Sequence, residues 1–279
     1  MNTRKRIVAA TAAVLSLGLL AGCGGNETAT PEPAVTVPGT ATPEPTEDPT
    51  EDPATPPTDG ALEFPEENLE FDRSVALADV EFTPGPARAD GGIPIGIGGV
   101  AGANLPSDVP ELTVYLDYRC GACYWFENIN LDLLTGFVND GTAQLVVHPV
   151  GMLGWDSGRV AAASAWVAAN APEQFFAFHV ALFEETFGDN PMGVDAASLA
   201  AIARGVGVPD AVAAGIASGE SFATYGQWAF SSASSFLTTP GLENADDQRG
   251  TPTIAINGVR WDGNWQSPEA LAAAINAAG

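Results

Sequence analysis

Cys120 and Cys123 are the residues of this 279-residue chain whose type and spacing most clearly allow chemistry. Only Gly121 and Ala122 separate them. Two cysteines at this spacing can supply ligands to a metal ion, form an inert structural disulfide, or exchange electrons with other thiols. The sequence around the pair has to decide among these three kinds of chemistry.

A predicted strand precedes the cysteine pair, and a predicted helix follows it. Residues 112–118 alternate in polarity and are rich in β-branched and aromatic side chains, as expected of a strand. Apolar residues then recur at helical spacing, at Phe126, Ile129, Leu133 and Phe137. Unpaired N–H groups and the helix dipole favour a thiolate where such a helix begins. We therefore expect Cys120 to be the exposed, attacking sulfur and Cys123 the resolving one.

The metal and structural-disulfide alternatives fit the sequence less well. A zinc site needs about four ligands, and apart from the cysteine pair the predicted globular part offers only His148 and His179. We interpret both histidines as structural, because one ends a predicted strand and the other lies among aromatic residues of a predicted helix. A Cys-x-x-Cys disulfide closes a short loop and constrains the unfolded chain little. We predict no metal and no cofactor beyond the redox-active pair.

The N-terminus has the features of a secretory signal peptide: a basic patch at residues 4–6, an apolar run over 7–20, and small residues after it. Leu20-Ala-Gly-Cys23 also resembles the lipobox of bacterial lipoproteins, which implies cleavage before Cys23 and lipidation of its sulfur. The alternative is an ordinary signal peptide with a chance cysteine. We predict a lipoprotein signal peptide over residues 1–22. The two remaining cysteines then form an even pair in an oxidising compartment.

Residues 23–88 are predicted to form a disordered, extended tether. Proline recurs at short intervals among threonine and acidic residues, and such a composition buries too little apolar surface to fold. Loss of residues 1–22 would change the formal charge from −25 to −28, because three basic residues and no acidic ones leave. Nucleic acid and anionic lipid headgroups are poor partners for so acidic a surface. The same charge favours a soluble monomer.

Residues 89–279 are predicted to form one globular domain. The strand at 112–118, the helix after Cys123 and a second strand at 143–148 form a βαβ unit, which implies parallel strands. Residues 155–240 follow and are predicted to be almost wholly helical.

The C-terminal part returns to strands. Residues 253–256 lead into an Asn257-Gly258 turn and a second short strand. A last helix begins at Ser267-Pro268, an N-cap residue followed by proline. Earlier in the chain, Asp156 or Ser157 is the expected N-cap of the first inserted helix. The whole order is βαβ, helical insertion, ββα, which predicts an α/β thioredoxin fold with a helical domain between its halves.

Two motifs resemble those of the DsbA-like thioredoxin-fold proteins. Asp117-Tyr-Arg-Cys-Gly-Ala-Cys123, followed by aromatic residues and Glu127, looks like the family's active-site strand and helix. Arg249-Gly-Thr-Pro-Thr253, before Ile254-Ala-Ile-Asn-Gly258, looks like the loop that faces it. The segment QFFAFHVALFEE, residues 174–185, also resembles part of the family's helical insertion. The resemblance implies that Pro252 is cis and faces the cysteines, and that Thr251 docks a substrate peptide.

The sequence departs from the family pattern at two places. Gly121 and Ala122 replace a proline and a histidine or tyrosine that are common there, which leaves the redox potential open. Several thioredoxin-fold enzymes have a buried acid six residues before the first cysteine, where this chain has Val114. Asp117 is the nearest acid in sequence and a candidate for proton transfer. A solvated or turn-forming carboxylate at the strand end is the alternative.

Together these features predict an extracytoplasmic thiol–disulfide oxidoreductase, held by its lipid on the outer face of the plasma membrane. The expected reaction transfers the Cys120–Cys123 disulfide to thiols of exported proteins through a mixed disulfide at Cys120. The family implies a membrane redox partner that re-oxidises the pair. Two alternatives remain: a cell-surface thiol reductant or isomerase that uses the same site, and a tethered peptide-binding module without redox activity.

Overall fold

A five-stranded mixed sheet forms the centre of the computed structural model, which describes residues 66, 69–188 and 192–279. Its strands are β1 (Ile93–Ile95), β2 (Glu111–Leu116), β3 (Gln144–Pro149), β4 (Thr253–Ile256) and β5 (Val259–Arg260). They lie in the order β1-β3-β2-β4-β5. The pair β2 and β3 is parallel, as the predicted βαβ unit requires, and the other pairs are antiparallel.

The strand that leads to the cysteines is the middle one of the sheet. Val114 of β2 lies opposite Val147 of β3 on one side and Ile254 of β4 on the other. Helices cover both faces of the sheet, and β2 is apolar along most of its length. Four of its six residues are buried and the other two are half-buried. The end of β2 is therefore held from both sides where the cysteine motif begins.

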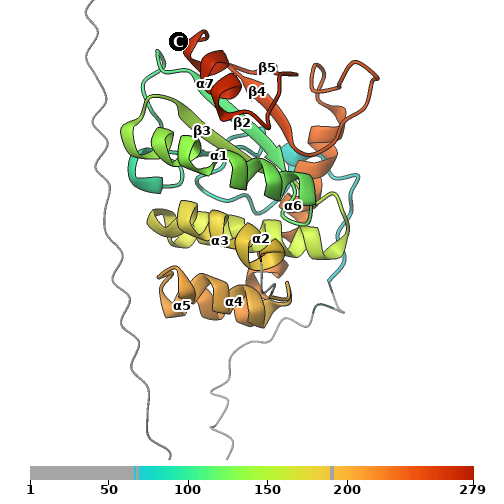
Figure 1. Cartoon of the computed structure of the whole chain (residues 1–279). Coiled ribbons are helices and arrows are strands. Elements are labelled where there is room, and N and C mark those ends of the chain that lie inside the picture. Colours follow the sequence, from blue (N-terminus) through green and yellow to red (C-terminus); the bar gives the residue numbers. More distant parts are fainter. Residues whose placement is uncertain (1–65, 67–68, 189–191) are drawn as a thin grey trace, which may run out of the picture. The chain divides into compact units, whose positions relative to one another are not determined.

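Helix α1 (Gly121–Asp140) connects β2 to β3 and carries the cysteine motif at its start. It begins after Cys120 and ends at Gly141, whose left-handed backbone (φ 70°) closes the last turn. The last helix, α7 (Pro268–Asn276), begins as predicted: the Ser267 side chain accepts a hydrogen bond from the N–H of Ala270. Helices α1 and α7 lie against each other (Figure 1).

The insertion consists of α2 (Trp155–Asn170), the short helix η4 (Pro172–Gln174), α3 (Phe175–Phe187), α4 (Ala196–Gly205), α5 (Asp210–Ala217) and α6 (Glu220–Thr238). In Figure 1, α2 and α3 form a layer beneath α1, and α4 and α5 lie below that layer. Asp195 caps α4 as its type suggests. The predicted cap of α2 is wrong: the helix starts after Gly154, and Ser157 turns inward to Asp117 instead of capping.

The N-terminal boundary of the folded part differs from the expectation for residues 23–88. Residues 69–80, here called the strap, lie along α6 and the start of α2. The Phe71 ring lies 5.0–5.5 Å from three aromatic rings, those of Trp155, Phe222 and Phe230. Leu77 is buried. The composition of the strap is mostly polar, but it folds because its few apolar residues pack against the helices.

Polar contacts also hold the strap on α6. The side-chain amide of Gln227 bonds both the N–H and the C=O of Asp72, and the Ser231 hydroxyl donates to the Val75 carbonyl. Just before the strap, Glu66 pairs with Arg159 of α2. The predicted signal peptide, Cys23 and residues 24–65, 67 and 68 of the predicted tether lie outside the described residues.

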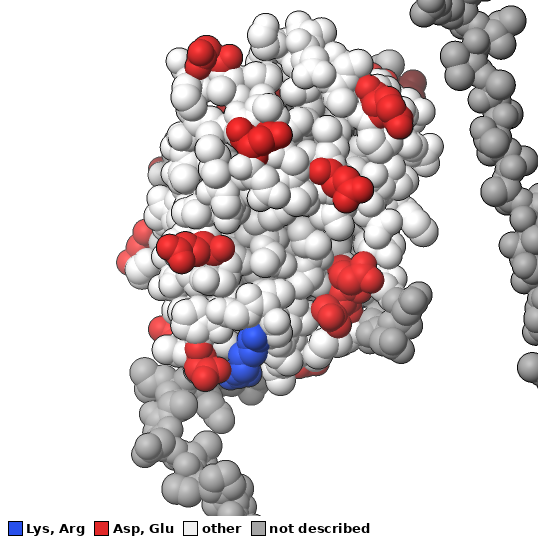
Figure 2. Space-filling model, turned by 60° about the vertical axis from the view of Figure 1, so that its left-hand side comes forward, with Lys and Arg blue, Asp and Glu red and all other residues white. Residues whose placement is uncertain are grey.

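The charged side chains on the face of the described domain in Figure 2 are mostly acidic. The face in Figure 2 carries scattered aspartate and glutamate side chains and little basic surface. Several arginines are engaged in ion pairs, among them Arg88, Arg159, Arg249 and Arg260. None of the helices in the described ranges combines the length and apolar character needed to cross a bilayer.

Candidate functional site

The two cysteines occupy the first turn of α1 and differ sharply in exposure. Cys120 is the N-cap residue and is partly exposed, whereas Cys123 is fully buried. The N–H groups of Cys123 and Tyr124 both donate to the Cys120 carbonyl, at 3.0 and 3.1 Å, and so start the helix. Both thiols are free. The structure thus places an accessible sulfur above a protected one, as the position at a helix start predicts.

The environment of Cys120 strongly favours the thiolate. A hydrogen bond from the Cys123 thiol is the largest cause that lowers the pKa of Cys120, which falls from 9.0 to about 5. The Thr251 side chain and the backbone N–H groups of Cys123 and Ala122 lower the pKa further, and partial burial opposes them. The helix start named in the sequence analysis contributes these two N–H groups. The larger contribution comes from the second thiol, which lies three residues later in the same helical turn.

The environment of Cys123 has the opposite effect. Burial is the largest cause that raises the pKa of the Cys123 thiol, and its interaction with Cys120 raises the pKa further. At neutral pH the pair therefore consists of one thiolate and one thiol. When the two sulfurs separate or join, it is Cys123 that must take up or release a proton.

The loop before β4 faces the cysteines from across the site. The peptide bond between Thr251 and Pro252 is cis, as the resemblance implied. In its thiol form Cys120 donates a hydrogen bond to the Thr251 carbonyl, 3.2 Å from the sulfur, although 131 positions separate the two residues. Strand pairing explains the contact. Because β4 runs antiparallel to β2, the start of β4 lies beside the end of β2, and the loop before β4 therefore lies beside the start of α1. The structure thus brings together the two motifs that the sequence singled out.

Asp117 is not solvated, as one of the predicted alternatives would have it. It is completely buried at the end of β2, and burial is the largest cause that raises its pKa. Its carboxylate accepts hydrogen bonds from the N–H groups of Arg119, Met152 and Leu153 and from the Ser157 hydroxyl, at 2.8–3.0 Å. The bond to Arg119 is the turn predicted as an alternative. The other bonds tie the end of β2 to the start of α2, so Asp117 anchors the loop that precedes Cys120.

A second buried polar group lies behind Cys123, and the sequence analysis did not assign it. Glu127 of α1 lies 3.3 Å from the Nε2 atom of His179 in α3. The Nδ1 atom of His179 is 2.9 Å from the Tyr118 hydroxyl, which is 2.9 Å from the Ser164 hydroxyl. The position of Glu127, one helical turn after Cys123, was the available sequence signal. Nothing in the sequence pairs it with a histidine of the insertion.

The other histidine, His148, belongs to strand β3 and lies away from the cysteine pair. His148 is buried, stacks on Tyr115 with ring centroids 4.3 Å apart, and lies 3.6 Å from the Asp90 carboxylate. This pairing lowers the pKa of Asp90 to about 2. Within the ranges that the structure describes, no group of three or more histidine, cysteine, aspartate or glutamate side chains is arranged to hold a metal ion.

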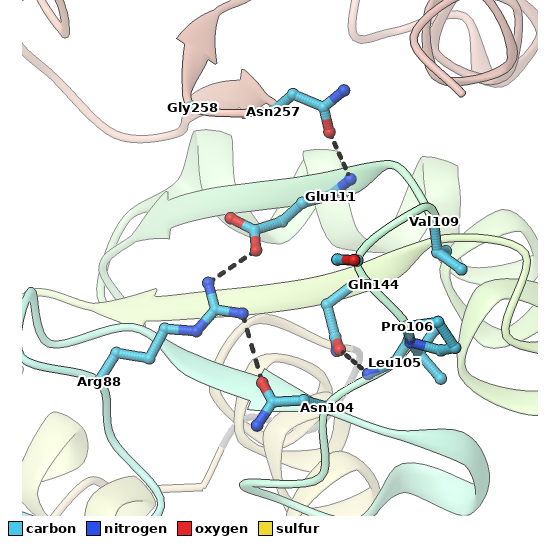
Figure 3. Close-up of a pocket in the computed structure, with 10 residues that line it drawn as sticks. Arg88, Asn104, Leu105, Pro106, Val109, Glu111, Gln144, Asn257 and Gly258 are labelled. Carbon is cyan, nitrogen blue, oxygen red and sulfur yellow. Dashed lines mark hydrogen bonds and ion pairs between the residues drawn. The ribbon is translucent and has the colours of Figure 1, made fainter.

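A pocket of about 540 Å³ lies at the opposite end of β2 from the cysteines (Figure 3). The Arg88 guanidinium group in its wall is already held by Glu111 at 2.7 Å and by Asn104 at 3.4 Å. The Gln144 amide bonds the backbone of Leu105 and Ile95. Because its polar groups bond one another, this pocket offers little to a ligand. The chemistry is concentrated at Cys120.

The family of the chain follows from the comparison with known families. The family model described as "Thioredoxin" matches residues 107–277, well over half of the chain. The chain therefore belongs to the thioredoxin family, and the predicted fold, a thioredoxin fold with a helical insertion, is confirmed. No curated protein matches the chain.

Solved structures of similar proteins narrow the class. MdbA from Actinomyces oris, a thiol-disulfide oxidoreductase, is 25% identical with a TM-score of 0.57, over 77% of this chain and 96% of that one. DsbA from Mycobacterium tuberculosis in its reduced form is 25% identical with a TM-score of 0.50, over 67% and 91%. BdbD from Bacillus subtilis shares the fold at 19% identity, with a TM-score of 0.52 over 71% and 97%. The predicted enzyme class is confirmed: this protein is a DsbA-like thiol–disulfide oxidoreductase.

Proposed function

We propose that this oxidoreductase works outside the cytoplasm and donates the Cys120–Cys123 disulfide to thiols of exported proteins. A substrate thiolate attacks the Cys120 sulfur, the disulfide to Cys123 breaks, and a mixed disulfide with substrate forms at Cys120. A second substrate thiolate then attacks the substrate sulfur of that mixed disulfide. Two electrons pass from the substrate thiols to the cysteine pair.

The pKa of Cys120, lowered to about 5, is the observation that carries this proposal. A thiolate held this stable is a good leaving group, so the second attack expels it readily. A reduced form stabilised in this way also makes the disulfide a better oxidant. The same feature disfavours a peptide-binding module without redox activity, since binding alone has no use for a stabilised thiolate.

Thr251 and Pro252 are proposed to bind the substrate peptide beside Cys120. The Thr251 carbonyl lies 3.2 Å from the Cys120 sulfur, so a peptide bound along this loop would place its cysteine next to the thiolate. A membrane redox partner would re-oxidise the pair. No cofactor other than the cysteines is needed for this exchange.

The cellular location rests on residues 1–65. We propose that cleavage before Cys23 and lipidation of its sulfur anchor a monomer on the outer face of the plasma membrane. The apolar run and the small residues before Cys23 support this proposal. The acidic tether after it would hold the domain away from the bilayer.

Trapping in cells tests the exchange. In a Cys123→Ser variant the Cys120 thiolate can still attack a disulfide of an exported protein, which is the reverse of the second step, but no Cys123 thiol can displace the bound protein. Disulfide-linked adducts should therefore accumulate through Cys120. The matched control is the Cys120→Ser, Cys123→Ser double variant, which should form none. Equal adducts in both variants, or none in either, would contradict the proposed exchange.

The direction of electron flow is set by the redox potential of the pair, measured by equilibration with glutathione. A potential near ~−120 mV supports the disulfide donor, and one near ~−270 mV supports the alternative of a surface reductant or isomerase.

A further inference from the structure

A buried carboxylate and imidazole face each other between the redox helix α1 and helix α3 of the insertion. Glu127 and His179 are 5% and 0% exposed, and Oε1 and Nε2 lie 3.3 Å apart. In the described part of the chain, Oε2 of Glu127 and Nε2 of His179 make no hydrogen bond. Buried polar atoms without partners are uncommon and mark places where a protein exchanges protons or holds water.

We propose that Glu127 and His179 together donate a proton to Cys123, and take it back, during disulfide exchange. This inference rests on the proposed redox function of the cysteine pair. It assigns a proton-transfer role to a histidine of the helical insertion, so the insertion would take part in the chemistry as well as in the fold.

The position of Glu127 relative to Cys123 is the first support. Residues four apart on a helix lie on one face, with Cβ atoms about 5–6 Å apart. Both side chains are buried on that face of α1. The Glu127 carboxylate and the Cys123 thiol are therefore buried on one face of α1, one helical turn apart.

The surroundings of the pair make Glu127 the available acid. Asp117 also lies near the cysteines, but its carboxylate already accepts four hydrogen bonds from the loop and from α2. A proton placed on Asp117 would break at least one of them. Glu127 has an oxygen without such bonds, and His179 is the basic group that faces it.

The Tyr118 hydroxyl can hydrogen-bond to the His179 imidazole in either protonation state of the imidazole. Its hydroxyl lies 2.9 Å from Nδ1 of His179 and 2.9 Å from the Ser164 hydroxyl, and either hydroxyl can be the donor. The phenol can therefore donate to a neutral imidazole or accept from a protonated one, while Ser164 adjusts. The imidazole can gain or lose a proton at Nε2 without losing its other hydrogen bond.

A small cleft connects Glu127 to solvent. It lies between α1 and α3, is lined by Tyr124, Glu127, Phe183 and Glu184 among others, and has a volume of about 20 Å³. A cavity of this size holds about one water molecule. Glu184 is exposed, so protons lost from or delivered to Glu127 can pass through the cleft to bulk water.

The proton balance of the step is simple. When a substrate thiolate attacks Cys120, the Cys120–Cys123 bond breaks and the Cys123 sulfur leaves with the electron pair. A proton passes from the Glu127–His179 pair to this sulfur, and solvent restores it through the cleft. In re-oxidation a disulfide of the oxidising partner first joins one of its sulfurs to Cys120. The Cys123 thiol then returns the proton, its sulfur attacks Cys120, and the partner's sulfur leaves as a thiolate.

The test is the rate at which dithiothreitol reduces the Cys120–Cys123 disulfide of the full chain, followed against pH. Glu127→Gln keeps the shape of the side chain but removes the acid, and should slow the reduction about tenfold or more, in keeping with general acid–base catalysis. The pH dependence of the rate should flatten as well. Asp132→Asn is the matched control, because it removes an exposed carboxylate from the same helix outside the cleft, and should stay within about twofold of wild type.

Two further measurements keep the inference open to refutation if Glu127→Gln folds poorly. Tyr118→Phe leaves the pair in place and should shift the pH dependence with a smaller loss of rate. The infrared difference spectrum between oxidised and reduced wild type should show a change in protonation of a buried carboxyl group. A folded Glu127→Gln protein with the wild-type rate and pH profile, or no such carboxyl signal, would overturn the relay. Failure of the wild-type protein to exchange with dithiothreitol would instead refute the proposed function.

Discussion

The strap gives the sharpest test of where the folded protein begins. Phe71 lies in the segment whose composition predicted disorder, yet its ring packs against Trp155, Phe222 and Phe230. Gly226 of α6 has no side chain at the point where the Phe71 ring approaches it. If these contacts hold the strap, Phe71→Ala should destabilise the whole domain.

The expected magnitude follows from burial. Truncation of a fully buried phenylalanine to alanine costs about 3–5 kcal/mol. Phe71 is only partly buried, so we expect a loss of about 2 kcal/mol in the free energy of unfolding. Phe82, 54% exposed and a few residues further along, is the matched control. Phe82→Ala should change that free energy by less than about 0.5 kcal/mol, as surface substitutions usually do.

Urea unfolding followed by tryptophan fluorescence measures both variants. The midpoint should fall for Phe71→Ala and stay for Phe82→Ala, with an unchanged slope in both. An equal, small effect of the two substitutions would refute the reasoning. It would mean that the strap rests on the domain without stabilising it and that the predicted tether extends to residue 88.

Two further predictions concern the cysteines. Cys123→Ala removes the thiol that contributes most to the low pKa of Cys120, so the midpoint of Cys120 alkylation should rise from about pH 5 by at least one unit. Thr251→Val should raise this midpoint less. An unchanged midpoint in Cys123→Ala would show that the Cys123 thiol does not cause the low pKa of Cys120. Cys23→Ala should release the protein from membranes or block its maturation, as fractionation of cells would show. Unchanged attachment would remove the proposed lipid anchor.

The sequence predicts where Asp117 lies, but it does not predict most of the partners of its carboxylate. Its proximity to the cysteines follows from three intervening residues, and the turn to Arg119 follows from its type at a strand end. The partners that occupy the rest of its carboxylate lie 35 to 40 positions later, at Met152, Leu153 and Ser157. Their position depends on how α2 packs beneath the sheet.

Local sequence determined much of this protein. The alternation of β2, the helical spacing after Cys123, the Asn257-Gly258 turn and the Ser267 cap each act over a few residues, so their types alone indicate the elements. The order of these elements then predicts the fold, and the start of α1 predicts which sulfur is exposed.

Tertiary structure decided what depends on residues far apart in the chain. Thr251 meets Cys120 across 131 positions because β4 pairs with β2. Glu127 meets His179 because the insertion packs against α1. The strap folds because Phe71 packs against apolar residues of α2 and α6. Hydrophobic burial and long-range pairing set these contacts, and no short stretch of sequence contains both partners.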